Sequence, residues 1–172
     1  NEIVKSDLRD FIVTHQTDPW IGNPLEGYVH IDNGNKGKFG EMFVEKYMTL
    51  LGYQVDERTD PGHDRVIDGM KIEIKFNRHK GLPKKDLYLI NHISIDKDWD
   101  RLIFFGINPV YNESRFLFFD KSDFVENLDH LKKEKNVYHQ QGGTEISNDD
   151  YIVQRHGVPK LHSQPWVYDI HD

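Results

Sequence analysis

Apolar side chains recur at helical spacing in two parts of the chain. Residues 2–15 form one such pattern, and residues 38–51 form a longer one that Gly52 can end. In the second pattern the apolar side chains fill roughly half of the helix circumference, and Glu41 falls at the edge of that arc. Glu41 can therefore face whatever the helix packs against. A third helix is predicted to start at residues 120–123, where Asp120-Lys-Ser-Asp123 offers capping side chains.

Strand patterns lie between these helices. Residues 53–58 alternate between apolar and polar, while residues 101–107 and 115–119 are nearly continuous apolar runs. Such runs are typical of strands that are covered on both faces, so the first is expected at the centre of a sheet. The tail from residue 136 to residue 172 is predicted to be irregular, apart from a strand near residues 151–154. The mixture of helices and strands indicates an α/β (α+β mixed) fold.

A tight hairpin is the strongest local signal. Asp68-Gly69 favours a two-residue turn, because a type I′ turn needs positive φ at both central positions. The turn fixes the register of the two strands, with the predicted pairs Ile67–Met70, Val66–Lys71, Arg65–Ile72 and Asp64–Glu73. Paired Cβ atoms lie roughly 4.5–5.5 Å apart, so the last pair could hold one hard cation between two carboxylates. Lys75 shares the face of Glu73, because side chains alternate along a strand.

Composition restricts the kinds of protein that this chain can be. Its 172 residues suffice for a single domain with one core, and no apolar run is long enough to cross a bilayer. We expect a soluble, cytoplasmic protein. The chain has no cysteine, which removes disulfides and thiolate chemistry, and none of its histidines has a recognised zinc spacing.

Charge is distributed unevenly along the chain. The net charge of −7 argues against non-specific nucleic-acid binding over the whole surface. Between Lys71 and Lys85, however, six cations stand against the single acid Glu73. A basic strip beside carboxylates is where a phosphate backbone could be held.

Asp64, followed by a hairpin into Glu73-Ile74-Lys75, resembles the D…E-x-K signature of the PD-(D/E)xK nuclease superfamily. The proline of that signature is displaced here, to Pro61 of Pro-Gly-His-Asp. The helix start Lys-Gly-Lys-Phe-Gly-Glu41 and the run W-D-R-L-I-F-F-G-I-N-P also resemble restriction-endonuclease-like members. Taken together, the resemblance covers about residues 36–130.

The resemblance implies a restriction-endonuclease-like core, with a central mixed β-sheet of about 4–5 strands flanked by helices. Residues 1–172 would form one nuclease domain around that core. The superfamily would also place a crossing helix near residues 86–95, with Asn91 or His92 directed at the site.

The resemblance also implies a set of functional residues. Asp64, Glu73 and the carbonyl of Ile74 would bind Mg²⁺, which Mn²⁺ could replace, and hard oxygen ligands favour these ions over zinc. Lys75 would hold the attacking water, and Glu41 would belong to the metal site or its surroundings. The predicted DNA-binding residues are Asn77, Arg78, His79, Lys80, Lys84 and Lys85.

These features predict a Mg²⁺-dependent DNA endonuclease of the type II restriction kind. A homodimer acting on double-stranded DNA is expected, because one site cuts one strand and palindromic targets mirror a two-fold axis. One alternative is a repair or junction-resolving nuclease of the same fold. The other is a non-catalytic domain that binds nucleic acid or a protein partner.

Overall fold

The computed structural model describes residues 18, 21–22, 26–78, 88–108, 113–139, 150–153, 160–161 and 163–171. The chain divides into two compact units, residues 1–32 and residues 33–172. In the first unit, the short 3-10 helix η1 (Tyr28–His30) follows Gly27, whose backbone N–H donates to Asp18 Oδ2 at 2.7 Å. The helix predicted over residues 2–15 lies outside the described residues. No helix in the described part of the chain is long and apolar enough to span a bilayer.

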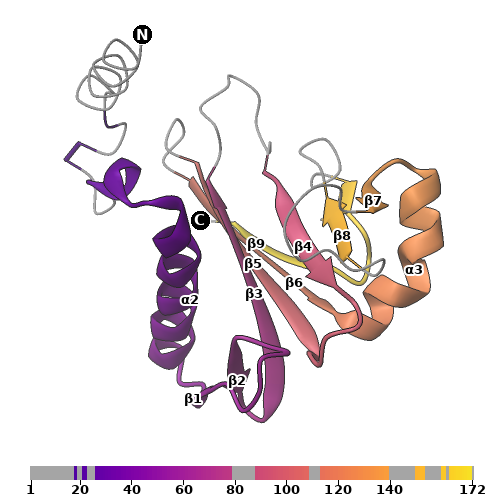
Figure 1. Ribbon diagram of the computed structural model, residues 1–172, viewed down its shortest axis with the longest axis horizontal. Coiled ribbons are helices and arrows are strands. Elements are labelled where there is room, and N and C mark those ends of the chain that lie inside the picture. The colour runs from indigo at the N-terminus through magenta and orange to yellow at the C-terminus, as the bar shows by residue number, and fades with distance from the viewer. Residues whose placement is uncertain are drawn as a thin grey trace, which may run out of the picture. The chain divides into compact units, whose positions relative to one another are not determined.

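The second unit contains the helices α2 (Asn33–Leu50) and α3 (Lys121–Lys133) and two β-sheets (Figure 1). The larger sheet is mixed, with the strand order β1-β2-β3-β5-β6-β9. Its strands are β1 (Val55–Glu57), β2 (Arg65–Ile67), β3 (Met70–Arg78), β5 (Arg101–Asn108), β6 (Glu113–Asp120) and β9 (Tyr168–His171). The smaller sheet, in the order β4-β8-β7, consists of β4 (Ile90–Ser94), β8 (Asp150–Val153) and β7 (Val137–His139). This arrangement confirms the predicted fold class.

Strand β5 lies at the centre of the larger sheet, as its apolar run predicted. It pairs in parallel with β3 and antiparallel with β6. Residues 36–130 supply five of the six strands, in agreement with the expected 4–5, and β9 from the tail adds the sixth beside β6.

The two faces of this sheet are covered by different layers (Figure 1). On one face, Phe105 of β5 stacks on Phe43 of α2 with ring centroids 4.3 Å apart. On the other face, Phe104 joins a buried cluster with Phe124 and Leu131 of α3. Because successive side chains of β5 point in opposite directions, one apolar run fills both layers of the core.

The hairpin forms as predicted. Asp68 and Gly69 have φ angles of 47° and 81°, the positive values that the turn requires. The pairs Ile67–Met70, Val66–Lys71 and Arg65–Ile72 are all observed. The fourth predicted pair, Asp64–Glu73, is not part of the ladder, because the N–H of Asp64 donates to the carbonyl of Ile72 at 2.9 Å. Asp64 is thus offset by one residue from the predicted register.

Helix α2 begins five residues before the predicted start at residue 38, within a segment that contains Gly34 and Gly37. Glycine has a low helix propensity, so sequence pattern alone did not identify this first turn. The helix ends as predicted at Gly52, which has a φ of 91°. The N–H groups of Gly52 and Tyr53 bond to the carbonyls of Thr49 and Met48, closing the helix with a Schellman motif.

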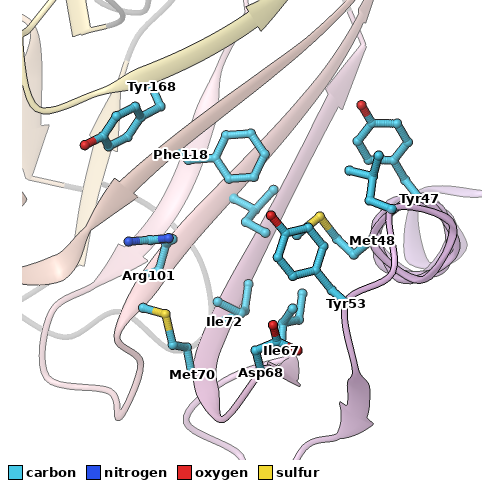
Figure 2. A pocket seen from close by; sticks show the side chains of 12 residues that line it. Tyr47, Met48, Tyr53, Ile67, Asp68, Met70, Ile72, Arg101, Phe118 and Tyr168 are labelled. Atoms are coloured by element: carbon cyan, nitrogen blue, oxygen red, sulfur yellow. The ribbon is translucent and has the colours of Figure 1, made fainter.

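An apolar groove of about 500 Å³ lies beyond the end of α2, on the same side of the sheet (Figure 2). Met48, Ile72 and Phe118 are among the side chains that line it. Leu51, at its edge, is 56% exposed, and Leu50 is 85% exposed. Both leucines belong to the predicted apolar arc, but at the end of α2 they remain largely exposed.

The crossing helix expected near residues 86–95 is wrong for the described residues, which form strand β4 instead. A register shift separates Ile90 from Ile93, and His92 between them has a φ of 53°. This bulge allows Ile90 and Ile93 to be buried together, although residues three apart on a regular strand face opposite sides. The apolar spacing of this segment did not decide between helix and strand, and the helix was expected from the superfamily resemblance alone.

The C-terminal tail is more regular than predicted. The strand expected near residues 151–154 is observed as β8, but β7 and β9 were not predicted. Both are short, and their pairing depends on partners elsewhere in the chain. Asp120 precedes α3 as expected, yet its carboxylate does not cap the helix and instead bonds to Arg101 Nε at 2.6 Å.

The contact between α2 and β3 gives a test of this packing. A Cβ added to Gly40 would lie 2.3 Å from Cβ of Phe76, whereas one added to Gly37 would meet open space. Gly40→Ala is expected to lower the free energy of unfolding by about 1–3 kcal/mol through overpacking. Gly37→Ala is expected to raise it by about 0.5–1 kcal/mol, because alanine favours the helix. Urea denaturation measures both, and equal changes would contradict this packing.

Candidate active site

Asp64 immediately precedes β2, and its carboxylate turns toward β3. Oδ2 accepts a hydrogen bond from the N–H of Ile74 at 2.7 Å. This bond holds the aspartate beside the peptide that joins Glu73 to Lys75, even though Asp64 and Glu73 are not ladder partners. The hairpin therefore brings the predicted D…E-x-K residues together by a side-chain bond to the backbone.

Glu73 and Lys75 lie on the same face of β3, as predicted. Lys75 Nζ donates to Glu73 Oε1 at 2.5 Å. Glu73 is only 4% exposed, and this burial raises the pKa of its carboxyl above the ordinary value. The charge of Lys75 opposes that rise in pKa, while the charge of Asp64 adds to it. Glu73 is thus a buried carboxylate whose ionised form is stabilised by the neighbouring ammonium group of Lys75.

Glu41 reaches the same site from α2. Burial is the main cause that raises its pKa, and the negative charge of Asp64 is the next. Glu73 adds a smaller contribution in the same direction, and Arg65 and Arg58 oppose it. The carboxylates of Asp64 and Glu73 are therefore close enough to Glu41 to raise its pKa.

These groups line a cleft of about 400 Å³. Its acidic lining residues are Glu41, Asp64 and Glu73, and its basic lining residues are Arg58, Lys75 and Lys97. Acid and base are balanced in number, so the cleft does not simply repel a phosphate. We refer to it below as the acidic cleft.

Other predicted residues are only partly placed at the acidic cleft. Asn77 lines it, and so do Asn91 and His92 from β4, although β4 is a strand. Arg78 ends β3, but the direction of its side chain is not described. The remaining predicted DNA-binding residues, His79, Lys80, Lys84 and Lys85, lie outside the described residues.

Sequence reasoning missed two cations of the cleft. Arg58 follows β1, and Lys97 lies in the turn between β4 and β5. Neither forms an ion pair within the part of the chain that the structure describes. A single basic residue in a loop has no distinguishing pattern, so only folding reveals that both lie beside the carboxylates.

The donor groups of the acidic cleft suit a hard divalent cation. Asp64 and Glu73 offer carboxylate oxygens. The charge of Asp64 raises the pKa of Glu73, and a cation bound between the two carboxylates would relieve this repulsion. Among the described residues, no three histidine, aspartate or glutamate side chains converge as a complete ligand set. A cation held here would therefore need further oxygens, such as the predicted Ile74 carbonyl and water.

Comparisons with known proteins bear on the fold. A restriction endonuclease in complex with substrate DNA matches with a TM-score of 0.50 and 15% identity, over 80% of this chain and 70% of that chain. A bacterial homing endonuclease, I-Ssp6803I, matches with a TM-score of 0.41 and 17% identity, over 55% of this chain and 69% of that chain. No protein-family model and no curated protein matches. The first likeness shows that the chain has a restriction-endonuclease-like fold, as its PD-(D/E)xK resemblance predicted.

The Glu73–Lys75 pair predicts a stability effect that does not involve a metal. Lys75→Met leaves a buried carboxylate without its amine, so the free energy of unfolding should fall by about 2–4 kcal/mol. Lys71→Met is the matched control, because Lys71 lies on the same face of β3 but pairs with Asp98, which is 64% exposed. Water can solvate Asp98, and a smaller loss is expected. Urea denaturation without divalent cations measures both, and equal losses would argue against the special burial of Glu73.

Proposed function

We propose that this chain is a Mg²⁺-dependent DNA endonuclease, and more narrowly a type II restriction endonuclease. The observation that carries the proposal is the hydrogen bond that places the Asp64 carboxylate beside Glu73 and Lys75 on one hairpin. The likeness of the fold to a restriction endonuclease adds support. An arrangement of two carboxylates and an amine in a cleft suits phosphodiester hydrolysis.

Each group of the acidic cleft has a proposed role. Mg²⁺ held by Asp64, Glu73 and the Ile74 carbonyl would supply Lewis acidity and a water with a lowered pKa. Lys75 would orient the attacking water through its ammonium and offset the charge that grows on the scissile phosphate. Glu41, which reaches the cleft from α2, would orient water or the ligands of the metal ion. The ion pair between Lys75 and Glu73 would hold the Lys75 ammonium next to the proposed metal ligand Glu73.

The substrate would be held by the cations of the cleft. Arg58 and Lys97 would each contact a phosphate, and Asn77 would donate hydrogen bonds beside them. The basic residues predicted from the sequence to bind DNA, Arg78, His79, Lys80, Lys84 and Lys85, would bind further phosphates. Two copies of the chain would be needed to cut both strands of a palindromic target, so we propose a homodimer on double-stranded DNA.

Digestion of mixed plasmid and phage DNA tests the activity. With Mg²⁺, or with Mn²⁺ in its place, the wild-type chain should give discrete fragments, and chelator should abolish them. Asp64→Asn should reduce cleavage by more than about 100-fold, because it removes a ligand charge while retaining the oxygen that Ile74 bonds to. End mapping of the fragments identifies the target sequence.

The same digestion separates the alternatives. Cleavage restricted to branched DNA would favour a repair or junction-resolving nuclease. DNA that stays intact with every divalent cation, together with wild-type DNA binding in Asp64→Asn, would overturn the enzyme assignment in favour of a binding domain.

Salt dependence tests the proposed phosphate contacts. Binding of the uncleaved target should weaken as salt rises, with a slope that reports the number of phosphates contacted. Arg58→Gln and Lys97→Gln should each reduce the magnitude of that slope by about 0.9. Lys133→Gln, at an exposed lysine of α3, is the control and should leave the slope unchanged. Unchanged slopes in the first two variants would show that these cations do not contact phosphates.

A further inference from the structure

Arg65, the first residue of β2, joins elements that are distant in the sequence. Its Nε donates to Glu45 Oε2 at 3.1 Å, and its Nη1 lies 3.4 Å from Glu41 Oε2. The same Nη1 donates to the backbone carbonyl of Asp64 at 2.7 Å. The side chain is only 15% exposed. One guanidinium therefore contacts two carboxylates of α2 and the backbone of the hairpin.

This placement matters because the acidic cleft draws its carboxylates from separate elements. Glu41 arrives on α2, whereas Asp64 arrives on the segment before β2. Neither residue's position follows from the other's local structure. Arg65 is a planar fork whose several N–H groups point in fixed directions, so it can set the distance between the two elements as well as balance their charge.

The two carboxylates of α2 contact Arg65 differently, and we call Glu45 the anchor of its guanidinium. Glu45 holds Arg65 at the shorter distance and is 41% exposed, at the outer side of the network. Glu41 lies at the longer distance and lines the acidic cleft. Glu45 thus fixes the guanidinium, and the guanidinium in turn holds Glu41 and the Asp64 backbone beside each other.

We propose that Arg65 is a positioning residue of the nuclease site, whose fork sets the Glu41 carboxylate relative to Asp64. The inference rests on the proposed function, because the relative position of Glu41 and Asp64 affects catalysis only if the acidic cleft is a nuclease site. Arg65 is not among the described residues that line the acidic cleft. It acts through the carboxylates that it orients, as outer partners of metal ligands do.

Arg65→Lys is the decisive variant, because lysine keeps the positive charge and loses the fork. At saturating Mg²⁺, kcat should fall by about 10–100-fold, while KM for DNA changes by less than about twofold. Ca²⁺ affinity, measured by calorimetry without DNA, should fall by at least about threefold. This second readout does not depend on cleavage.

Arg101→Lys is the matched control. Arg101 also sits on a strand of the larger sheet and bonds Asp120 through two nitrogens, at 2.6 and 3.2 Å. It lines the apolar groove. Arg101→Lys should leave kcat and Ca²⁺ affinity within about twofold of wild type. Comparison with this variant separates the specific effect of Arg65→Lys from the general effect of replacing a paired arginine by lysine.

Glu45→Gln provides a test if Arg65→Lys does not fold. It weakens the anchor at a half-exposed position and leaves Arg65 in place, so kcat should fall by about threefold or more. Wild-type kcat and Ca²⁺ affinity in Arg65→Lys would overturn the positioning role and leave the nuclease proposal intact. A wild-type chain that binds Ca²⁺ but cuts no DNA would overturn the nuclease proposal, and the Ca²⁺ affinities would then decide the role of Arg65. Absence of both Ca²⁺ binding and cleavage in the wild type would overturn both.

Discussion

The hydrogen bond from the Ile74 N–H to the Asp64 carboxylate is the interaction on which the candidate site depends. The β2–β3 ladder stops before Asp64, so strand pairing alone does not place this residue. The carboxylate itself takes the place of the missing ladder partner by accepting a backbone N–H. As a result, the aspartate is fixed beside Ile74, between Glu73 and Lys75, and it lines the acidic cleft.

The acidic cleft concentrates groups that oppose folding. Burial and mutual repulsion raise the pKa values of Glu41 and Glu73, so their ionised forms are less favourable here than in water. Lys75 and Arg65 offset part of this cost by direct contacts. Phe43 and Phe105 stack on the face of the larger sheet that lies opposite to Glu73 and Lys75, and their contact supplies apolar burial. A rigid core therefore supports a site that would be unstable alone, as is common where charges serve a function.

Features governed by neighbouring residues could be predicted from the sequence. The turn at Asp68-Gly69, the shared face of Glu73 and Lys75, and the end of α2 at Gly52 all follow from local φ preferences or from side-chain periodicity. The double burial of β5 likewise follows from its apolar run. The restriction-endonuclease-like fold was predictable because these local features occur in the order that the resemblance requires.

The sequence by itself thus determined the hairpin, the central strand and the identity of the acid and amine pair. Only the tertiary structure decided the offset of Asp64, the bulge that makes β4 a strand, and the gathering of Arg58, Arg65 and Lys97 around the carboxylates. The physical reason is range. Turns and alternation depend on torsion angles within a few residues, whereas these other features depend on contacts between segments that meet only when the chain folds.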